Sequence, residues 1–269
     1  MLISMEFLLY ILLVISLLFL VYVFVLVRPR KRDVSTDGLL TDYAHRGLHS
    51  ETVPENSLKA FQNAVDNGYG IELDVQLSKD GEVMVFHDYT LIRMTGVEKK
   101  LNELTKDELK TLSLKNTTET IPTFDEVLTL VDGKIPILIE LKGEDLDTRL
   151  CEKVADRLKE YNGKYCIESF NPLLIKKMKK FLPNVFYGQL YTNVCREHGV
   201  NIINLLLTCM ALNVISRPDF IAYNKLDRDS FPVILATKLY KAPRFVWTVK
   251  TPEEHGKAHS SNENAIFEK

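Results

Sequence analysis

The chain has 269 residues, of which 46% are hydrophobic and 26% are charged, and its formal net charge is −2 at pH 7. This composition is typical of a folded globular protein and excludes a largely disordered chain. The slightly acidic balance argues against nucleic-acid binding, for which a strongly basic domain is expected. The length allows one large domain with a short appendage.

Missing motifs exclude several further classes. The four cysteines are Cys151, Cys166, Cys195 and Cys209. They form no CxxC pair and do not have the spacing of zinc ligands. We expect buried or free thiols, as in a reducing compartment. The chain has no G-x-S-x-G, which argues against a serine hydrolase. It also has no G-x-G-x-x-G after a strand, which argues against a dinucleotide site.

The first predicted element is a membrane helix. Residues 7–27 are uncharged and almost wholly apolar, which is long enough to cross a bilayer. Glu6 is the only charged side chain before this run. The basic residues that follow the run are Arg28, Arg30, Lys31 and Arg32. The positive-inside rule then places the following domain in the cytoplasm. A cleaved signal peptide would instead have positive charge before the apolar run and small residues at a cleavage site.

The composition changes again after the basic flank. A short polar stretch precedes an apolar-rich region of the size of one α/β barrel. We therefore predict three parts, which are a transmembrane anchor at 1–32, a linker at 33–40 and a catalytic barrel domain at 41–269.

Beyond residue 41, short apolar runs alternate with helical patterns. We leave the return limb of a hairpin near residue 80 outside the sheet. The expected strands are then 42–45, 70–75, 135–142, 164–170, 185–190, 219–224, 245–249 and 265–268. Helices are expected between them, among them a helical region at 194–214. Eight such units predict an α/β fold, a (β/α)8 TIM barrel.

Capping residues predict where several helices begin. Asn56 or Ser57 can cap a helix after the first strand, and Thr123 can cap the helix of FDEVLTLV. Thr105 and Glu108 have the spacing of a capping box.

Two carboxylates end the second strand at i and i+2. Glu72 and Asp74 therefore face the same side of that strand. A turn is expected at residues 79–82, where Asp-Gly is a favoured hairpin pair. Folding the chain symmetrically about this turn brings Asp74 opposite His87. One hairpin is thus expected to bring two carboxylates and an imidazole together.

The first strand ends in His45, followed by Arg46 and Gly47. The guanidinium offers a fixed cation, and the glycine lets the backbone approach a ligand. Carboxylate oxygens suit a hard cation such as Ca²⁺ or Mg²⁺, and a neighbouring guanidinium suits a phosphate. Two histidines suit proton transfer near neutral pH. Together these groups predict metal-assisted phosphoryl transfer.

This stretch resembles the glycerophosphodiester phosphodiesterase family. The matching words are HRG (45–47), PENS (54–57), AF (60–61), IELDV (71–75), KDG (79–81), HD (87–88) and TG (95–96). The resemblance continues more loosely to residue 268.

Later words add three candidate residues. The run IPILIELK lacks polar alternation until its end, which is typical of a strand buried on both faces of a parallel sheet. Its Glu140 and Lys142 lie at i and i+2, at the strand end where barrel enzymes place catalytic groups. Trp247 opens the WTV word shared with the family and is expected to line the pocket wall.

The resemblance implies hydrolysis of glycerophosphodiesters to glycerol 3-phosphate and an alcohol. The expected ligands of one divalent cation, Ca²⁺ or Mg²⁺, are Glu72, Asp74 and Glu140. The expected substrate-binding residues are Arg46, Lys142 and Trp247. The general acid and base, in either assignment, are expected to be His45 and His87. The expected partners are a small-molecule or lysolipid phosphodiester and the membrane.

Three alternatives stay open. A membrane anchor gives access to lipid, so lysophospholipase D activity on lysophospholipids is one hypothesis. A related metal-dependent phospholipase of the same barrel type would give a different product, such as a diacylglycerol or a cyclic phosphate. A non-catalytic membrane-anchored binding protein is the third, and the complete set of acidic and histidine residues argues against it.

The C-terminal third departs from the family pattern. Lys250 follows WTV where relatives often have Asn, and the last strand reads NAIFEK instead of ending in Ile-Thr-Asp. These changes affect the expected leaving-group pocket. The residues without evident partners, which we expect to be structural or on the surface, are Cys195, His198, His255 and His259. The lysine run 176–180 is expected to be a solvated helix face.

Overall fold

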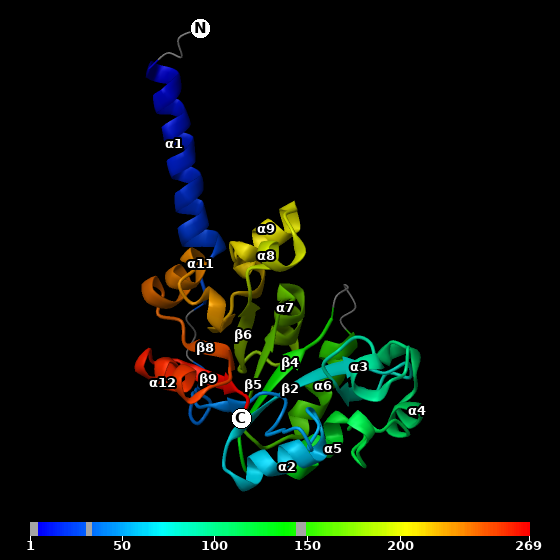
Figure 1. The fold of residues 1–269 in the computed structure, drawn as a ribbon. Helices are drawn as coiled ribbons and strands as arrows, with labels where there is room; N and C mark the ends of the chain where they lie inside the picture. The colour runs from blue at the N-terminus through cyan, green and yellow to red at the C-terminus, as the bar shows by residue number, and fades with distance from the viewer. Residues whose placement is uncertain (1–4, 31–33, 144–148) are drawn as a thin grey trace.

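A closed parallel barrel forms the body of the protein. The computed structural model describes residues 5–30, 34–143 and 149–269. β1 (Tyr43–Ala44) pairs with both β2 (Gly70–Leu77) and β9 (Asn264–Phe267), which closes the sheet. The strands between them are β4 (Ile137–Leu141), β5 (Tyr165–Ser169), β6 (Phe186–Tyr191), β7 (Phe220–Asn224) and β8 (Arg244–Val249). The predicted (β/α)8 barrel is confirmed, and each strand lies within two residues of its expected bounds (Figure 1).

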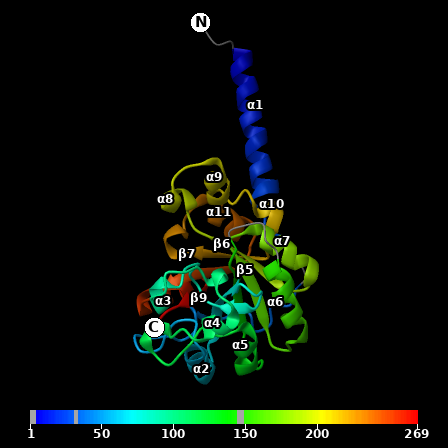
Figure 2. The same cartoon turned by 90° about the vertical axis from the view of Figure 1, so that its right-hand side faces the viewer.

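Helices cover the outside of the barrel, as Figures 1 and 2 show from two directions. They are α2 (Leu58–Asp66), α5 (Phe124–Val131), α6 (Arg149–Glu160), α7 (Pro172–Phe181), α11 (Phe231–Ile234) with the π-helical η5 (Leu235–Leu239), and α12 (Pro252–Ser260). Ser57 Oγ accepts from Ala60 N at 3.1 Å and caps α2. Thr123 caps α5 as expected. The predicted capping box of Thr105 with Glu108 begins α4 (Lys106–Lys110).

The helical region expected at 194–214 consists of three short helices. They are α8 (Val194–His198), α9 (Ile202–Thr208) and α10 (Asn213–Ser216). Gly199, with φ +79°, ends α8, and the Asn201 side chain accepts from Asn204 N to begin α9. A left-handed glycine followed by a capping asparagine interrupts a helix, so the region forms a compact loop structure after β6.

The hairpin register differs from the expected one. β3 (Val83–Val85) pairs with β2 through Val75 opposite Val85, and Phe86 N donates to Asp74 O at 2.9 Å. Asp74 therefore lies opposite Phe86, and the expected pairing with His87 is wrong by one residue. The cause is the turn, in which Ser78 N donates to Glu82 O around a three-residue loop that ends in left-handed Gly81 (φ +81°).

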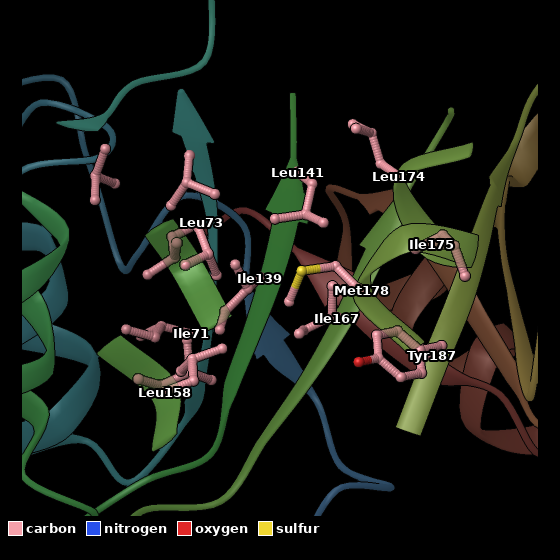
Figure 3. Packing of buried hydrophobic residues seen from close by; sticks show 14 of the residues in the cluster. Ile71, Leu73, Ile139, Leu141, Leu158, Ile167, Leu174, Ile175, Met178 and Tyr187 are labelled. Carbon is pink, nitrogen blue, oxygen red and sulfur yellow. The ribbon is translucent and has the colours of Figure 1, made fainter. Parts of the chain in front are cut away.

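Strand alternation separates the core from the site. Ile71 and Leu73 point outward from β2 and pack with residues of the surrounding helices, as Figure 3 shows for the outer core. Inside the barrel, a second cluster fills the N-terminal end of the lumen, where the rings of Phe220 and Phe245 lie 4.6 Å apart. The intervening positions on β2 and β4 are then available for polar groups at the opposite end.

The segment after the hairpin carries a small core of its own. It contains α3 (Ile92–Thr95), the 3₁₀ turns η2 (Leu101–Glu103) and η3 (Leu114–Asn116), and α4. Its buried residues include Met84, Phe86, Leu91, Leu101 and Leu109, so this insertion is an extension of the hairpin rather than a further domain.

One helix in the described residues is long and apolar enough to cross a membrane. It spans Met5–Leu26, 22 residues, and comprises α1 (Met5–Val21) and the π-helical η1 (Tyr22–Leu26). A cleaved leader meets the same criteria of length and composition. α1 projects beyond the barrel in both views (Figures 1 and 2). The predicted basic residues Lys31 and Arg32, the linker residue Asp33 and the helix residue Thr148 lie outside the described residues.

The C-terminal end of this helix is packed against the barrel. Val27 is fully buried, and its carbonyl oxygen accepts from Asn213 Nδ2 at 3.1 Å. Tyr22 donates its hydroxyl to Cys209 O at 3.0 Å, and Tyr240 donates to Val23 O at 2.8 Å. Several hydrogen bonds over one helical turn fix the direction in which α1 leaves the barrel.

Candidate active site

Three buried carboxylates lie together at the C-terminal end of the barrel. Glu72 and Asp74 project from β2, and Glu140 projects from the neighbouring strand β4, where it pairs in register with Asp74. One oxygen of each carboxylate lies within 4.8 Å of the others, and the residues are 2%, 0% and 7% exposed. The i, i+2 spacing on β2 therefore directs both side chains into the lumen, as expected.

The electrostatics of this cluster favour a bound cation. Burial raises the pKa of Glu72 well above its usual value, and the charges of Asp74 and Glu140 raise it further. Burial also raises the pKa of Glu140. Buried like charges are unfavourable without a counter-ion. Carboxylate oxygens at this spacing are the ligands that Ca²⁺ and Mg²⁺ prefer, so the residues fit a divalent cation.

Two cations flank the carboxylates. Lys142 Nζ lies 2.7 Å from Glu140 Oε1 and 3.0 Å from Asp74 Oδ1, and its side chain is 9% exposed. Arg46 N donates to Glu72 Oε2 at 2.9 Å, while Arg46 Nε lies 3.7 Å from Asp74 Oδ2. Lys142 and Arg46 thus lie on two sides of the acidic cluster, within reach of an anion bound there.

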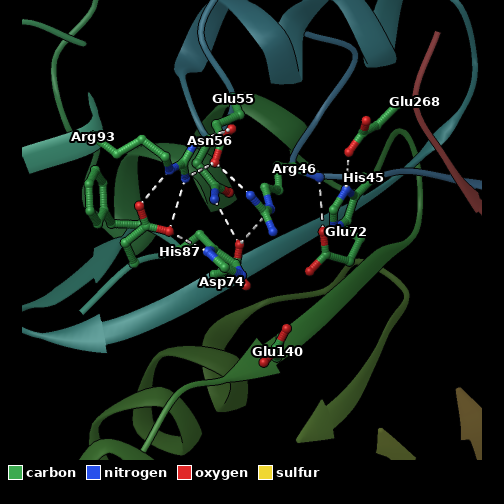
Figure 4. Close-up of polar contacts among 12 residues, drawn as sticks. His45, Arg46, Glu55, Asn56, Glu72, Asp74, His87, Arg93, Glu140 and Glu268 are labelled. Atoms are coloured by element: carbon green, nitrogen blue, oxygen red, sulfur yellow. Dashed lines mark hydrogen bonds and ion pairs between the residues drawn. The ribbon is translucent and has the colours of Figure 1, made fainter. Parts of the chain in front are cut away.

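His45 is oriented by a carboxylate from the far end of the chain. His45 follows β1, and its Nδ1 lies 2.8 Å from Glu268 Oε1, directly after β9 (Figure 4). Burial lowers the pKa of His45, although the hydrogen bond to Glu268 opposes this change. The neutral ring then donates its Nδ1–H to Glu268, and Nε2 is the nitrogen available to a substrate. Lys250 Nζ, 2.8 Å from Glu268 Oε2, fixes the carboxylate in turn.

His87 has an equivalent partner next to it in sequence. Its Nδ1 lies 2.6 Å from Asp88 Oδ1, and Asp88 also accepts from Arg93 Nε at 2.6 Å. Burial would raise the pKa of Asp88, but His87 and Arg93 lower it well below the usual range. Both candidate catalytic histidines therefore have an ionised carboxylate at Nδ1, which is a common way to orient an imidazole for proton transfer.

Residues of the PENS word hold two of the site's side chains in place through hydrogen bonds. Glu55 Oε1 accepts from Arg46 Nη1 at 2.7 Å, and Asn56 Nδ2 donates to Asp74 Oδ2 at 2.8 Å. Ser57 begins α2 immediately afterwards. Gly47 lets this loop pack closely, because a Cβ at Gly47 would lie 2.9 Å from the Ala60 Cβ. This close packing explains why a glycine follows Arg46.

Two of the three carboxylates, Glu72 and Glu140, line a small pit that adjoins a larger chamber. The pit has a volume of about 90 Å³ and also contains both histidines, Arg46, Lys142 and Trp247. Trp247 Nε1 donates to Ala222 O at 3.1 Å, and its ring meets Phe170 edge-on at 5.8 Å. The chamber has a volume of about 590 Å³ and shares six lining residues with the pit, namely His87, Glu140, Lys142, Phe170, Leu190 and Trp247. All eight residues predicted for the site therefore line one connected cavity or lie directly beside it.

Sequence reasoning missed several polar residues of this site. Glu168 on β5 lies opposite Glu140, is 1% exposed and also lines the pit. Burial raises its pKa well above the usual value, with a further contribution from Glu140, which favours the neutral acid. The available signal was the IESF strand end, where Glu168 occupies the same relative position as Glu140. No local signal marked Glu268, because its partner lies 223 residues away.

Two histidines for which the sequence indicated no partner share the same carboxylate. His255 Nε2 and His259 Nε2 both lie 2.8 Å from Asp42 Oδ2. Asp42 Oδ1 also accepts from Ala265 N at 2.8 Å. This cluster lies before β1 and therefore at the opposite end of the barrel from the carboxylate pit. It joins α12 to the strands that close the barrel.

Comparison with known proteins shows the family to which this chain is similar. Residues 45–267 match the model of the glycerophosphoryl diester phosphodiesterase family. A glycerophosphodiester phosphodiesterase of Caldanaerobacter subterraneus subsp. tengcongensis is 41% identical over 159 residues, which are 55% of this chain and 65% of that protein. A Bacillus altitudinis glycerophosphodiester phosphodiesterase is 30% identical over 167 residues, 58% of this chain and 68% of that protein. The matches thus cover about two thirds of these relatives.

Solved structures with the same fold extend the likeness over the barrel. A glycerophosphodiester phosphodiesterase of Thermotoga maritima matches with a TM-score of 0.66 and 27% identity, covering 88% of this chain and 96% of that one. An Oleispira antarctica phosphodiesterase, solved with the product sn-glycerol-3-phosphate, matches with a TM-score of 0.68 and 22% identity, covering 85% and 92%. Together with the family match over residues 45–267, these findings show that the chain belongs to the glycerophosphoryl diester phosphodiesterase family.

Proposed function

We propose that this protein hydrolyses glycerophosphodiesters to glycerol 3-phosphate and an alcohol. The observation that carries the proposal is a cluster of three buried carboxylates at a pit lined by two histidines, each of which is oriented by a further carboxylate. The solved Oleispira antarctica phosphodiesterase contains sn-glycerol-3-phosphate, which is the product proposed here.

Arg46 and Lys142 bind the phosphate in this proposal. Both cations lie beside the carboxylate cluster, and Lys142 is 9% exposed on its side chain. Their charges stabilise the negative charge that develops on the phosphoryl oxygens in the transition state. Glu55 holds the Arg46 guanidinium in place at 2.7 Å, so this charge is positioned before the substrate arrives.

His45 and His87 transfer the protons. One histidine removes a proton from the attacking hydroxyl, and the other donates a proton to the departing alkoxide, since in-line displacement needs one group on each side of phosphorus. The bond between phosphorus and the leaving alcohol breaks while a new P–O bond forms. The attacking group is water or a neighbouring hydroxyl of the substrate. Both histidines present Nε2 because Glu268 and Asp88 hold their Nδ1 atoms.

Glu72, Asp74 and Glu140 hold one divalent cation, Ca²⁺ or Mg²⁺. When bound, the cation polarises a phosphoryl oxygen and neutralises charge. Asn56 supports this role, because its Nδ2 donates to Asp74 Oδ2 and fixes that carboxylate.

We also infer a single-pass anchor with the catalytic domain on the cytoplasmic side. In this proposal the chain divides into an anchor at 1–32, a linker at 33–40 and a barrel at 41–269. The basic residues Arg28 and Arg30 after the apolar helix support this orientation. The hydrogen bonds of Tyr22, Val23 and Val27 to the barrel support a retained helix, because a leader that is removed needs no such contacts.

The test is release of glycerol 3-phosphate from glycerophosphocholine and glycerophosphoethanolamine by the full chain in detergent. The assay is run with EDTA and then with added Ca²⁺ or Mg²⁺. We expect metal-dependent release that His45→Ala and Glu72→Ala each reduce by at least about 100-fold, in line with the contribution of general acid–base catalysis.

The outcomes distinguish an enzyme from a binding protein. Folded protein that binds metal but releases no product from either diester would overturn the proposal and favour a non-catalytic binding role. Release that continues unchanged in His45→Ala would contradict the assignment of the site. A cyclic phosphate that accumulates first would identify the substrate's own hydroxyl as the attacking group.

A further inference from the structure

Two histidines of α12 and a carboxylate before β1 converge at the end of the barrel opposite the carboxylate pit. His255 Nε2 and His259 Nε2 each lie 2.8 Å from Asp42 Oδ2. One potential ligand atom from each of these residues lies within 4.8 Å of the other two, which in the described part of the chain is also true of the three carboxylates at the pit. We refer to these three residues as the Asp42 cluster.

The spacing of the histidines directs both rings to one point. His255 and His259 are four residues apart on α12, so they lie on the same face of the helix. Two histidines at this spacing on a helix bind zinc in metalloproteases, in which a glutamate after the first histidine acts as general base. Gly256 occupies that position here. The spacing therefore supports a bound metal ion without hydrolysis at this site.

Two of the three side chains are held in place by contacts outside the cluster. Asp42 Oδ1 accepts from Ala265 N at 2.8 Å, which leaves Oδ2 for the two imidazoles. The ring of His255 stacks on the ring of Phe267 in β9, with centroids 5.5 Å apart and planes 28° apart. Ligands that are already oriented by such contacts lose little freedom when an ion binds.

The separation of the ligand atoms suits an ion of the size of Zn²⁺. Zinc binds nitrogen and oxygen at about 2.0–2.2 Å, so the ligand atoms of a tetrahedral site lie about 3.4 Å apart. The distances of 2.8 Å from Nε2 to Oδ2 are those of hydrogen bonds, and they need to lengthen by only about 0.6 Å around an ion. Small rotations of the rings allow this change, because the side chains of His255 and His259 are 33% and 58% exposed.

The ligand set distinguishes this site from the carboxylate pit. Imidazole nitrogens suit zinc and other transition metals, whereas the oxygen ligands at the pit suit Ca²⁺ and Mg²⁺. Zinc accepts a mixed set of nitrogen and oxygen ligands in tetrahedral geometry, and water can be the fourth ligand. The exposure of His259 lets solvent reach this fourth position.

We propose that the Asp42 cluster binds one Zn²⁺ ion, which fastens α12 to the strands that close the barrel. The ion takes the place of the Nε2 protons, each neutral ring carries its proton on Nδ1, and Asp42 supplies one carboxylate oxygen. Because the cluster lies at the opposite end of the barrel from the pit, the proposal does not depend on the proposed phosphodiesterase function.

The position of the cluster in the chain explains what the ion does. Asp42 precedes β1, whereas α12 precedes β9, and β1 and β9 are the strands whose pairing closes the sheet. Asp42 and His255 are 213 residues apart in sequence. An ion that needs both residues binds the folded chain only, so zinc stabilises the closed barrel.

Thermal unfolding of the full chain in detergent tests the site. Excess Mg²⁺ is present throughout to occupy the carboxylate pit, and Zn²⁺ is then added. At a zinc concentration of about 100 times Kd, we expect Tm to rise by about 5 to 10 °C. His259→Gln, a change at an exposed side chain that leaves the fold intact, should lose most of this rise. The matched control is His198→Gln, an exposed histidine at the end of α8, which should retain the full rise.

The variants separate the Asp42 cluster from other zinc ligands of the chain. Glu140→Gln removes a ligand of the pit and should retain the zinc-dependent rise. An equal rise in the unmodified protein and in His259→Gln would overturn the proposal, because the zinc would then be bound elsewhere. No rise in the unmodified protein would also overturn it and would leave the Asp42 cluster as a hydrogen-bonded contact.

Cobalt substitution measures the coordination itself, independently of stability. Tetrahedral Co²⁺ with imidazole ligands absorbs visible light strongly, whereas six-coordinate Co²⁺ with oxygen ligands absorbs weakly. We expect the strong bands in the unmodified protein and in Glu140→Gln, their loss in His259→Gln, and their loss when Zn²⁺ displaces the cobalt. A weak six-coordinate spectrum alone, or strong bands that persist in His259→Gln, would contradict the proposed ligand set.

Discussion

Each candidate catalytic histidine depends on a carboxylate that does not touch the pit directly. Glu268 holds His45 Nδ1 at 2.8 Å, and Asp88 holds His87 Nδ1 at 2.6 Å. Asp88 follows His87 in sequence and belongs to a recognisable word, whereas Glu268 comes from the last strand. Sequence words therefore predict the candidate catalytic groups, whereas the carboxylate that orients His45 depends on how the last strand closes the barrel.

Replacing Glu268 by Gln should slow the reaction by misorienting His45. We expect kcat to fall about tenfold to 100-fold, less than the full contribution of a general acid or base. Burial lowers the pKa of His45 and Glu268 raises it, so removing the carboxylate's charge should lower this pKa further. The pH–rate profile of Glu268→Gln should then shift toward lower pH in one limb.

The limb that moves also identifies the role of His45. A shift of the acidic limb assigns His45 as the base, and a shift of the alkaline limb assigns it as the acid. Glu253→Gln, an exposed acidic residue on α12, is the control and should change neither limb. A Glu268→Gln profile that coincides with that of the unmodified protein would contradict the positioning role.

Glu55 should make the protein sensitive to acid. Burial alone would raise its pKa, but Arg93 and Arg46 lower it from 4.5 to about 2. Its carboxylate is ionised in the folded state at a pH where the unfolded chain binds a proton. The ionised Glu55 carboxylate therefore contributes about 3 kcal/mol to the free energy of unfolding. This contribution is fully present above about pH 4.5 and is lost as the pH falls through about 2.

Urea unfolding between pH 6 and pH 2 measures this dependence. In Glu55→Gln the free energy of unfolding should fall less steeply with pH, by about 3 kcal/mol over the whole range. Glu51→Gln, a neighbouring exposed residue, should retain the steep dependence. Parallel pH curves for the unmodified protein and Glu55→Gln would show that Glu55 does not carry the effect.

At the level of elements, the apolar runs predicted every barrel strand because most positions of these strands are buried. β4, for example, is buried at all five positions. Hairpin geometry was less predictable, since Asp-Gly fits both a two-residue turn and a three-residue loop with left-handed glycine. The structure has the longer loop, which shifts the pairing of Asp74 by one residue. His87 still reaches the pit because β3 has ended at Val85.

The Asp42 cluster could not be predicted from spacing alone. His255 and His259 lie one helical turn apart, but their partner is 213 and 217 residues away. Asp42→Asn removes a carboxylate that accepts from Ala265 N and contacts both imidazoles. We expect a loss of about 1 to 3 kcal/mol in the free energy of unfolding, measured with urea.

A surface variant serves as a control, because it shows whether the loss of any charge on α12 has the same effect as disrupting the Asp42 cluster. Lys257→Gln, an exposed residue of the same helix, should leave the unfolding midpoint unchanged. Equal stability of Asp42→Asn and the unmodified protein would show that the cluster contributes nothing to holding α12 on the barrel.

For the whole molecule, a cation at the carboxylate pit should stabilise the closed barrel. The proposed ligands lie on β2 and β4, which are neighbouring strands, so an ion bound there would join them only in the folded state. A ligand at about 100 times its Kd adds about 2.7 kcal/mol, which corresponds to a rise in Tm of about 5 to 10 °C. We expect this rise when Ca²⁺ or Mg²⁺ replaces EDTA.

Glu140→Gln should abolish most of that rise, whereas Glu98→Gln, an exposed residue after α3, should retain it. Differential scanning calorimetry of the detergent-solubilised protein measures both. If the full rise persists in Glu140→Gln, the ion is bound elsewhere.

Barrel closure has a consequence for how the protein is made. β1, which precedes His45, acquires its neighbour β9 only after residues 264–267 have been synthesised. During synthesis His45 lacks its hydrogen-bond partner until Glu268, 223 positions later, has been added, whereas the apolar helix Met5–Leu26 is complete much earlier. A nascent chain, or one truncated before Glu268, therefore lacks the carboxylate that orients His45. The candidate site is therefore complete only once Glu268 has been added to the chain.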